Sequence, residues 1–279
     1  MKKKLQLVTF LVSLLMFVDA VSQVPEVLRV ALVPAEDSRA MIRQSEHLLA
    51  ELEEKLGIKV EGFVAGDYNG VIESLRAGHV DVAYMGPFSY VKAAQVAEVE
   101  PFAVAETENG LAYHSQIVVR ADSDIKNIEQ LRGKNFAFVA PTSTSGYVYP
   151  MVGMKEAGID IRKDLKNVVY SGGHDGSLLA VKHGQVHAAA VADRILDLAV
   201  QNGKIQPGEL RIIWRSEAIP ESPMVWRKDL PEQFKARIRD VFFSIRDIPF
   251  GDQGRISGYR ATDHQAYDIV RKAEALARQ

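Results

Sequence analysis

Short apolar runs alternate with amphipathic segments along most of this 279-residue chain, and no other feature constrains its fold as strongly. Leu28–Val33, Ile58–Val64 and Val80–Tyr84 have the length and apolar content of buried strands. The segments between them place apolar residues at helical spacing and end at Gly57 and Gly78, as helices commonly do. Because strands that alternate with helices usually form parallel sheets covered by those helices, the sequence predicts an α/β fold with mainly parallel sheets.

An internal similarity indicates two similar lobes. Gly70–Ala83 aligns with Gly176–Ala189: in both segments a helix begins near an Asp, stops at the second of two Gly residues, and is followed by a strand. With 47% hydrophobic residues, the chain has enough apolar material for two lobes of ordinary size. Ligands of such sheets bind at the loops that follow the carboxyl ends of the strands, so we expect the functional site there.

Two short apolar strands that run into polar stretches, Ile117–Arg120 and Ile212–Arg215, are the predicted crossings between the lobes. They assign residues 26–118 and 217–279 to the first lobe and residues 119–216 to the second. No Gly/Ser-rich or Pro-rich linker separates these segments. We therefore expect a short hinge with two chain crossings rather than two domains on a flexible tether.

The N-terminus has the composition of a secretory signal peptide. Lys2–Lys4 form a basic segment, and Leu5–Val18 form an apolar segment shorter than the about 20 residues that span a bilayer; a cleavage site follows Ala20. The sequence predicts that residues 1–20 are removed and that the mature protein is periplasmic; retention as a membrane helix is the alternative. The chain has no Cys, which excludes disulfides and a lipid anchor on Cys.

The charge of the chain excludes one class of partner. Cleavage would remove three of the 34 basic and one of the 36 acidic residues, leaving a formal net charge of −4. No basic cluster remains, so there is no electrostatic basis for binding nucleic acid or a membrane surface. We expect a monomer without a nucleic-acid partner and without stable membrane insertion after cleavage.

The tetrapeptide Ser143–Gly146 is the clearest candidate for a binding site. It follows the apolar run Phe136–Ala140 and precedes an apolar segment with the pattern of a helix. Three hydroxyls at the start of a helix lie beside unpaired backbone N–H groups and the positive end of the helix dipole, which together favour an oxyanion. An ordinary helix cap with additional hydroxyl residues is the alternative.

His174 stands between Gly173 and Asp175 at the predicted start of another helix. A lone His often caps a helix or lies on the surface, but an imidazole here can also donate to an anionic oxygen. His183 and His187 are four residues apart, yet a Gly and a strand start separate them, so they do not share a helix face. The sequence predicts no metal site and no cofactor.

Taken in order, several motifs resemble the phosphonate/phosphite/phosphate-binding periplasmic proteins of ABC importers, the PhnD-like family. The matching segments cover most of residues 27–245 and are Asp67–Tyr68, Gly70–Glu73, Val80–Pro87, Ser89–Tyr90, Ser143–Gly146, Gly173–Asp175, Ile219–Pro220 and Pro223–Lys228. The resemblance implies a two-lobed periplasmic binding protein of the second topological type. Such a protein closes on its ligand, delivers it to a membrane permease and catalyses no reaction.

The resemblance also implies the residues of the site. The oxyanion would be held by Ser143, Thr144, Ser145 and His174. The first lobe would line the cleft with Tyr68, Tyr84 and Met85. Asp193 stands where the family has an acidic residue near the ligand. Its side chain has three alternative roles: contact with an amine of the ligand, orientation of His174, or capping of a helix.

Two departures from the family pattern bear on the ligand. Met85 stands where an aromatic residue occurs in relatives, and Ser222 lies in a segment where others carry an acid, although Glu221 is adjacent. An acid there would suit an aminoalkyl tail, so its absence favours phosphite, phosphate or methylphosphonate over 2-aminoethylphosphonate.

Three other functions compete with an importer component. A hydrolase would use Ser143 or Ser145 with His174 and Asp193, but the serines do not stand in a Gly-x-Ser-x-Gly elbow. A periplasmic partner of a sensor kinase would use the same closed-lobe surface as a transport protein. A binder of another small oxyanion or organic solute is the third alternative.

Overall fold

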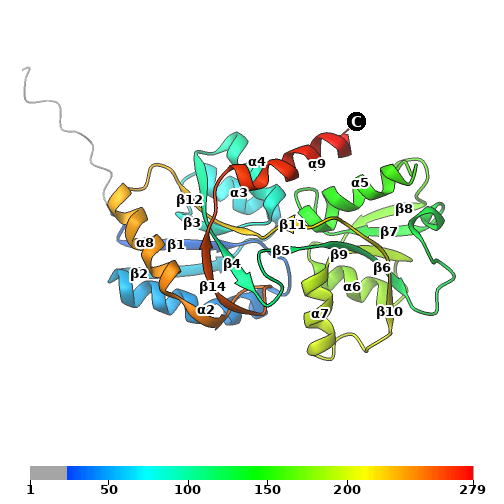
Figure 1. Ribbon diagram of the computed structural model, residues 1–279, viewed down its shortest axis with the longest axis horizontal. Coiled ribbons are helices and arrows are strands. Elements are labelled where there is room, and N and C mark those ends of the chain that lie inside the picture. The colour runs from blue at the N-terminus through cyan, green and yellow to red at the C-terminus, as the bar shows by residue number, and fades with distance from the viewer. Residues whose placement is uncertain (1–23, 279) are drawn as a thin grey trace, which may run out of the picture.

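The computed structural model describes residues 24–278, so the expected signal peptide lies outside the described residues. Within them, two sheets with helices packed on their faces form two lobes side by side (Figure 1). The sheet of the first lobe contains, in spatial order, β13 (Arg246–Pro249), β14 (Arg255–Ala261), β4 (Val99–Thr107), β12 (Pro223–Arg227), β3 (Val82–Tyr84), β1 (Val27–Leu32) and β2 (Lys59–Val64). The sheet of the second contains β10 (Leu210–Arg215), β6 (Ser115–Arg120), β9 (Ala188–Ala192), β7 (Asn135–Phe138) and β8 (Asn167–Tyr170).

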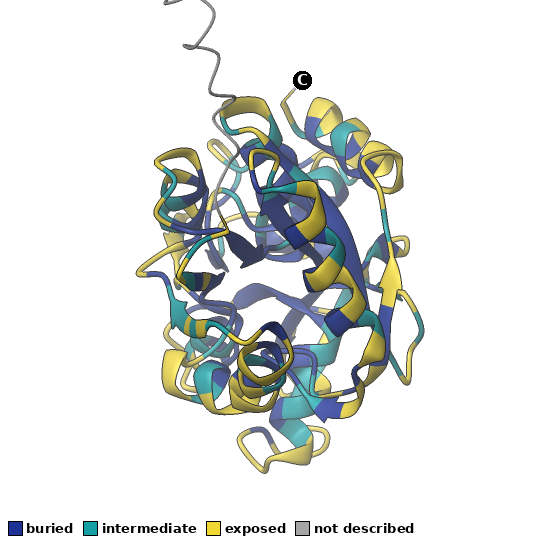
Figure 2. Ribbon diagram, turned by 90° about the vertical axis from the view of Figure 1, so that its left-hand side faces the viewer, coloured by how far each residue is buried: buried dark blue, intermediate teal, exposed yellow. Residues whose placement is uncertain are grey.

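The helices lie on the outside of these sheets, and their exposed residues face outward, whereas most strand residues are buried (Figure 2). The helices from the first-lobe segments are α2 (Ser38–Leu56), α3 (Tyr68–Arg76), α4 (Pro87–Val96), α8 (Glu232–Ser244) and α9 (Asp268–Arg278). Those of the second lobe are α5 (Tyr149–Glu156), α6 (His174–Lys182) and α7 (Asp193–Gln201). Among the described residues, no helix is both long and apolar enough to cross a membrane.

Helix α2 illustrates how the local sequence sets the elements. Asp37 caps its start by accepting a hydrogen bond from the backbone N–H of Ala40 at 3.0 Å. Its buried face recurs every three or four residues and consists of Met41, Ser45, Leu48, Leu52 and Leu56. Gly57 ends the helix with φ of 67°, a left-handed conformation that glycine adopts without strain. The predicted strand, helix and second strand at the N-terminus are therefore confirmed.

The two sheets share one topology. The order β2-β1-β3-β12-β4 in the first lobe matches β8-β7-β9-β6-β10 in the second. In each lobe the first three strands are parallel to one another, and the fourth strand is antiparallel to both of its neighbours. The sheets are thus mixed, and the expected parallel arrangement holds for the βα units at the core of each lobe. The two similar segments of the sequence form α3–β3 and α6–β9, which occupy equivalent places in this order.

The structure corrects the expected positions of the crossings. Ile117–Arg120 and Ile212–Arg215 lie in β6 and β10, which pair with each other inside the second sheet. The chain instead passes between the lobes at β5 (Ala112–Tyr113) and β11 (Ile219–Pro220), which form a two-stranded antiparallel ribbon. Residues 115–118 therefore belong to the second sheet. An apolar strand followed by polar residues has the same sequence pattern whether it pairs within a lobe or leaves it, so the pattern alone misplaced the hinge.

Helix α9 is a further connection between the lobes. It follows the last strand of the first sheet, contacts α4 of the first lobe and also lies against α5 of the second (Figure 1). The ammonium of Lys155, on α5, donates to the carbonyl oxygen of Leu276, on α9, at 3.0 Å. The C-terminal segment is thus a contact between the lobes in addition to β5 and β11.

Candidate functional site

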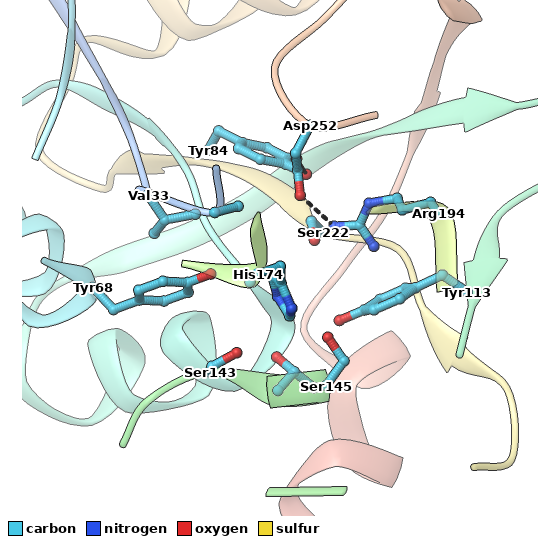
Figure 3. Close-up of a pocket in the computed structure, with 13 residues that line it drawn as sticks. Val33, Tyr68, Tyr84, Tyr113, Ser143, Ser145, His174, Arg194, Ser222 and Asp252 are labelled. Carbon is cyan, nitrogen blue, oxygen red and sulfur yellow. Dashed lines mark hydrogen bonds and ion pairs between the residues drawn. The ribbon is translucent and has the colours of Figure 1, made fainter. Parts of the chain in front are cut away.

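A cavity between the lobes is lined by residues that follow the carboxyl ends of strands in both sheets (Figure 3). The lining residues are Val33, Ala35, Tyr68, Tyr84, Gly86, Tyr113, Ser143, Thr144, Ser145, His174, Arg194, Ser222 and Asp252. Most of those in the first lobe lie at or after the ends of β1, β2 and β3, and those in the second follow the equivalent strands β7, β8 and β9. Tyr113 comes from β5, Ser222 from between β11 and β12, and Asp252 from between β13 and β14. The free space is about that of one water molecule, so the two lobes are closed closely on each other around it.

The hydroxyl-rich turn begins a helix, as the sequence predicts. Ser143 is the cap of a π-helical turn, Thr144–Val148, that continues into α5, and its Oγ accepts from the backbone N–H of Gly146 at 3.1 Å. A Cβ at Gly146 would lie 2.4 Å from the side chain of Val139, so the turn can pack here only with glycine. The π-turn, which is wider than a turn of α-helix, brings three hydroxyl residues to one helix start, where backbone N–H groups favour an anion.

Hydrogen bonds from both lobes meet at this turn. Thr144 Oγ1 accepts from the backbone N–H of Phe88, at the start of α4 in the first lobe, at 2.8 Å. The hydroxyl of Ser89, on the same helix, donates to the carbonyl oxygen of Thr142 at 2.8 Å. The backbone N–H of His174 donates to the carbonyl oxygen of Ala35 at 2.8 Å. The structure is therefore a closed state, in which the oxyanion-binding candidates contact the opposite lobe.

His174 is a neutral hydrogen-bond donor in this setting. Burial, together with the cationic Arg194, lowers the pKa of its imidazole to about 3. Its Nδ1 accepts from the backbone N–H of Ala192 at 3.1 Å, so the proton of the neutral ring is on Nε2. The ring extends into the space between the tyrosines and the serines (Figure 3). An Nε2–H there donates to an anionic oxygen without adding a charge.

Three tyrosines surround the cavity. Burial raises the pKa values of Tyr68 and Tyr84, and it raises that of Tyr113 to about 12, so all three keep their phenolic protons at neutral pH. Tyr84 donates its hydroxyl proton to Oδ1 of Asp252 at 2.6 Å. The ring of Tyr113 lies under the guanidinium of Arg194, with Cζ 4.3 Å from the ring centroid.

Arg194 places a positive charge in the cavity. Its Nη2 donates to Oδ2 of Asp252 at 2.8 Å, and this ion pair joins α7 of the second lobe to the loop between β13 and β14 of the first. The side chains are 10% and 1% exposed, so water screens the pair weakly. Burial by itself lowers the pKa of Arg194, but the carboxylates of Asp252 and Glu221 raise it well above its ordinary value.

The structure brings six of the eight predicted site residues to the cavity: Tyr68, Tyr84, Ser143, Thr144, Ser145 and His174. It corrects the placement of the other two. Met85, directly after β3, is fully buried and is not part of the cavity lining, because consecutive residues of extended chain point to opposite faces. The carboxylate of Asp193 contacts Nδ1 of His114 at 3.0 Å and Nη2 of Arg215 at 3.2 Å, outside the cavity lining.

Sequence reasoning missed the charged pair. Arg194 is the residue after Asp193 at the start of α7. Successive side chains of a helix point about 100° apart, so Arg194 lines the cavity and Asp193 does not. The signal for Arg194 was its place just after the buried strand β9. Asp252 lies in a C-terminal turn without a motif, so nothing in the sequence pointed to it. Among the described residues, no group of three His, Cys, Asp or Glu side chains is arranged to hold a metal ion.

Comparison with known proteins agrees with this geometry. Residues 30–267 match the family described as "ABC transporter, phosphonate, periplasmic substrate-binding protein". The chain is 34% identical over 266 residues to the "Phosphate-import protein PhnD" of Mycolicibacterium smegmatis, which covers 90% of this chain and 83% of that protein. It is 33% identical over 227 residues to the "Phosphonates-binding periplasmic protein" of Escherichia coli, which covers 80% of this chain and 67% of the relative.

A solved structure has the same architecture. The binding-protein component of an ABC phosphonate transporter from Pseudomonas aeruginosa superposes with a TM-score of 0.82 at 27% identity, over 90% of this chain and 86% of that one. The expected two-lobed binding-protein fold of the second topological type, with its two-crossing hinge, is thereby confirmed. The chain belongs to the family of periplasmic substrate-binding proteins of phosphonate ABC transporters.

Proposed function

We propose that this chain captures a small phosphorus oxyanion between its lobes and delivers it to the membrane permease of an ABC importer. The observation that carries the proposal is the convergence of Ser143, Thr144, Ser145 and His174 on one small interlobe cavity. The names of the two similar relatives, a phosphate-import protein and a phosphonates-binding protein, support the same ligand class.

The donors suit a ligand that must later be released. Each hydrogen bond from a neutral donor to an anionic oxygen contributes roughly 1.5–3 kcal/mol. A few such bonds, after the cost of ordering both lobes, reach about −8 to −12 kcal/mol, which is micromolar to nanomolar affinity. Closure then presents a surface that exists only in the liganded state, and a permease recognises that surface.

The proposed role is binding without catalysis. A hydrolytic triad needs a carboxylate that accepts from Nδ1 of the histidine, whereas Nδ1 of His174 accepts from the backbone of Ala192. The carboxylate of Asp193 contacts His114 instead. We further propose that the mature chain, after loss of residues 1–20, acts in the periplasm as a monomer.

The test is isothermal titration of the mature protein with phosphate, phosphite, methylphosphonate and 2-aminoethylphosphonate. Ser145→Ala removes a hydroxyl from the cavity without removing the Ser143 cap, and we expect affinity for every phosphorus ligand that binds to fall by about 10- to 150-fold. Ser257→Ala is the matched control, because Ser257 is exposed on β14 and, among the described residues, its hydroxyl forms hydrogen bonds only with Glu106. Failure of all four anions to bind the wild type, or equal affinity of the two variants, refutes the proposal.

A further inference from the structure

The guanidinium of Arg194 has two hydrogen-bond donors that the protein does not use. Nε and Nη1 are buried and have no hydrogen-bond partner among the described residues, whereas Nη2 is bound to Asp252. A buried, unsatisfied N–H of a charged group is costly, and this one lies in the lining of a cavity for an anion. The observation indicates that the ligand supplies the missing acceptor.

The carboxylate in the cavity lining is already engaged. Asp252 is the one carboxylate among the described lining residues; its Oδ1 accepts from Tyr84 and its Oδ2 from Arg194. Glu221 is not in the lining, and its Oε2 accepts from the backbone N–H of Ser222 at 3.0 Å and from the amide of Gln253 at 3.1 Å. An ammonium group at this position would therefore meet the guanidinium of Arg194, beside a lining carboxylate that already accepts two hydrogen bonds.

The arrangement of the donors defines the ligand's fourth position. Ser143 and Ser145 lie on one side of the cavity, and Arg194 and Asp252 lie across from them, with His174 between (Figure 3). A tetrahedral phosphorus anion that places three oxygens toward the hydroxyls and the imidazole directs its fourth substituent toward the guanidinium. That substituent is an oxygen in phosphate, a hydrogen in phosphite, a methyl group in methylphosphonate and a cationic chain in 2-aminoethylphosphonate.

We propose that Arg194, oriented by Asp252, determines the specificity of this protein by donating to a fourth oxygen, so that inorganic phosphate is preferred over phosphite and the phosphonates. The inference rests on the proposed oxyanion site and names its ligand. A hydrogen bond to a charged group that is present with one ligand and absent with the other corresponds to about a 10- to 150-fold difference in Kd. We expect this ratio between methylphosphonate and phosphate, and no measurable binding of 2-aminoethylphosphonate at concentrations that saturate with phosphate.

The variant must remove the donor without leaving a bare charge. Arg194→Met alone would leave the carboxylate of Asp252 unpaired beside the ligand and weaken every anion. The double variant Arg194→Met/Asp252→Asn removes opposite charges together, so it isolates the donor. Asp252→Asn alone keeps the guanidinium and tests the orienting role. Arg132→Met is the matched control, because Arg132 forms a half-exposed pair with Asp164 on the second lobe away from the cavity.

Titration of each variant at one pH with phosphate, phosphite and methylphosphonate gives the ratio of dissociation constants. We expect the ratio of the methylphosphonate Kd to the phosphate Kd to fall to about one in the double variant. The ratio should stay above one in Asp252→Asn and should equal the wild-type ratio in Arg132→Met. A circular-dichroism melt of each variant verifies that it is folded, and if the double variant does not fold, Arg194→Gln/Asp252→Asn replaces it.

Two results would overturn the inference. One is a wild-type protein that binds methylphosphonate or phosphite as tightly as phosphate, which would place the fourth substituent against Val33 and Ala35 instead. The other is a double variant with an unchanged ratio. Neither result contradicts the proposed function, because phosphorus anions still bind in both cases. A wild-type protein that binds none of these anions would instead refute the proposed function itself.

Discussion

Replacing Thr144 by Val separates ligand contact from lobe closure. The substitution keeps the shape of the side chain but removes the hydroxyl that accepts from the backbone N–H of Phe88. In the closed state that N–H would be left without an acceptor, which costs about 1–3 kcal/mol, and in an open state water would satisfy it. The lost donor to a ligand oxygen adds about 1.5–3 kcal/mol. We expect Kd for phosphate to rise by about two to four orders of magnitude.

The matched variant is Ser89→Ala, which removes the other hydrogen bond between α4 and this turn. Ser89 is buried and donates to the carbonyl oxygen of Thr142, but it is not part of the cavity lining. Loss of this hydrogen bond affects lobe closure alone. It should destabilise the closed state by about 0.5–1.5 kcal/mol, which raises Kd roughly 2- to 13-fold.

Titration calorimetry with phosphate measures both constants, and thermal unfolding without ligand provides the control for stability. Binding by Thr144→Val that equals binding by Ser89→Ala would show that the hydroxyl of Thr144 does not touch the ligand. A lower Tm of the unliganded Thr144→Val protein with unchanged affinity would show that the turn is purely structural.

Four further expectations concern stability. The pKa of His174 is depressed to about 3 in the folded state, so stability present at neutral pH is lost as the pH falls from about 6.5 toward 3. The free energy of unfolding at pH 5 should be lower by about 2 kcal/mol, as measured by urea unfolding, and a free energy of unfolding that does not change with pH would contradict this expectation. Burial, with a contribution from Asp252, raises the pKa of Glu36 from 4.5 to about 7, so its protonated form stabilises the fold at low pH and this contribution is lost as the pH rises from about 4.5 to 7. Glu36→Gln should therefore gain stability relative to wild type above pH 7, and an unchanged difference between pH 5 and 8 would count against this. Gly146→Ala should lower the Tm, since its Cβ would lie 2.4 Å from Val139, and a wild-type melting curve would show that the turn can shift. Saturating phosphate at 100 times Kd should add about 2.7 kcal/mol to the free energy of unfolding, and a Tm that does not depend on phosphate concentration would refute specific binding.

The sequence by itself determined the local elements and half of the site. Capping residues, terminal glycines and apolar spacing act over a few residues, so the helices and strands around Asp67, Gly57 and Ser143–Gly146 were predictable. The hydroxyl turn and His174 each lie directly after a strand at the start of a helix, which is where an α/β sheet places its ligand.

Only the tertiary structure decided the remaining half. The pair between Arg194 and Asp252 joins residues 58 positions apart in different lobes, and no short-range pattern encodes such a contact. The start of α7 decided that Arg194 rather than Asp193 faces the cavity, because each helical residue rotates by about 100°. The position of the hinge likewise depends on which distant strands pair, since β6 pairs with β10 inside the second lobe and β5 pairs with β11 between the lobes. Such pairing is set by long-range packing rather than by the apolar content of a single strand.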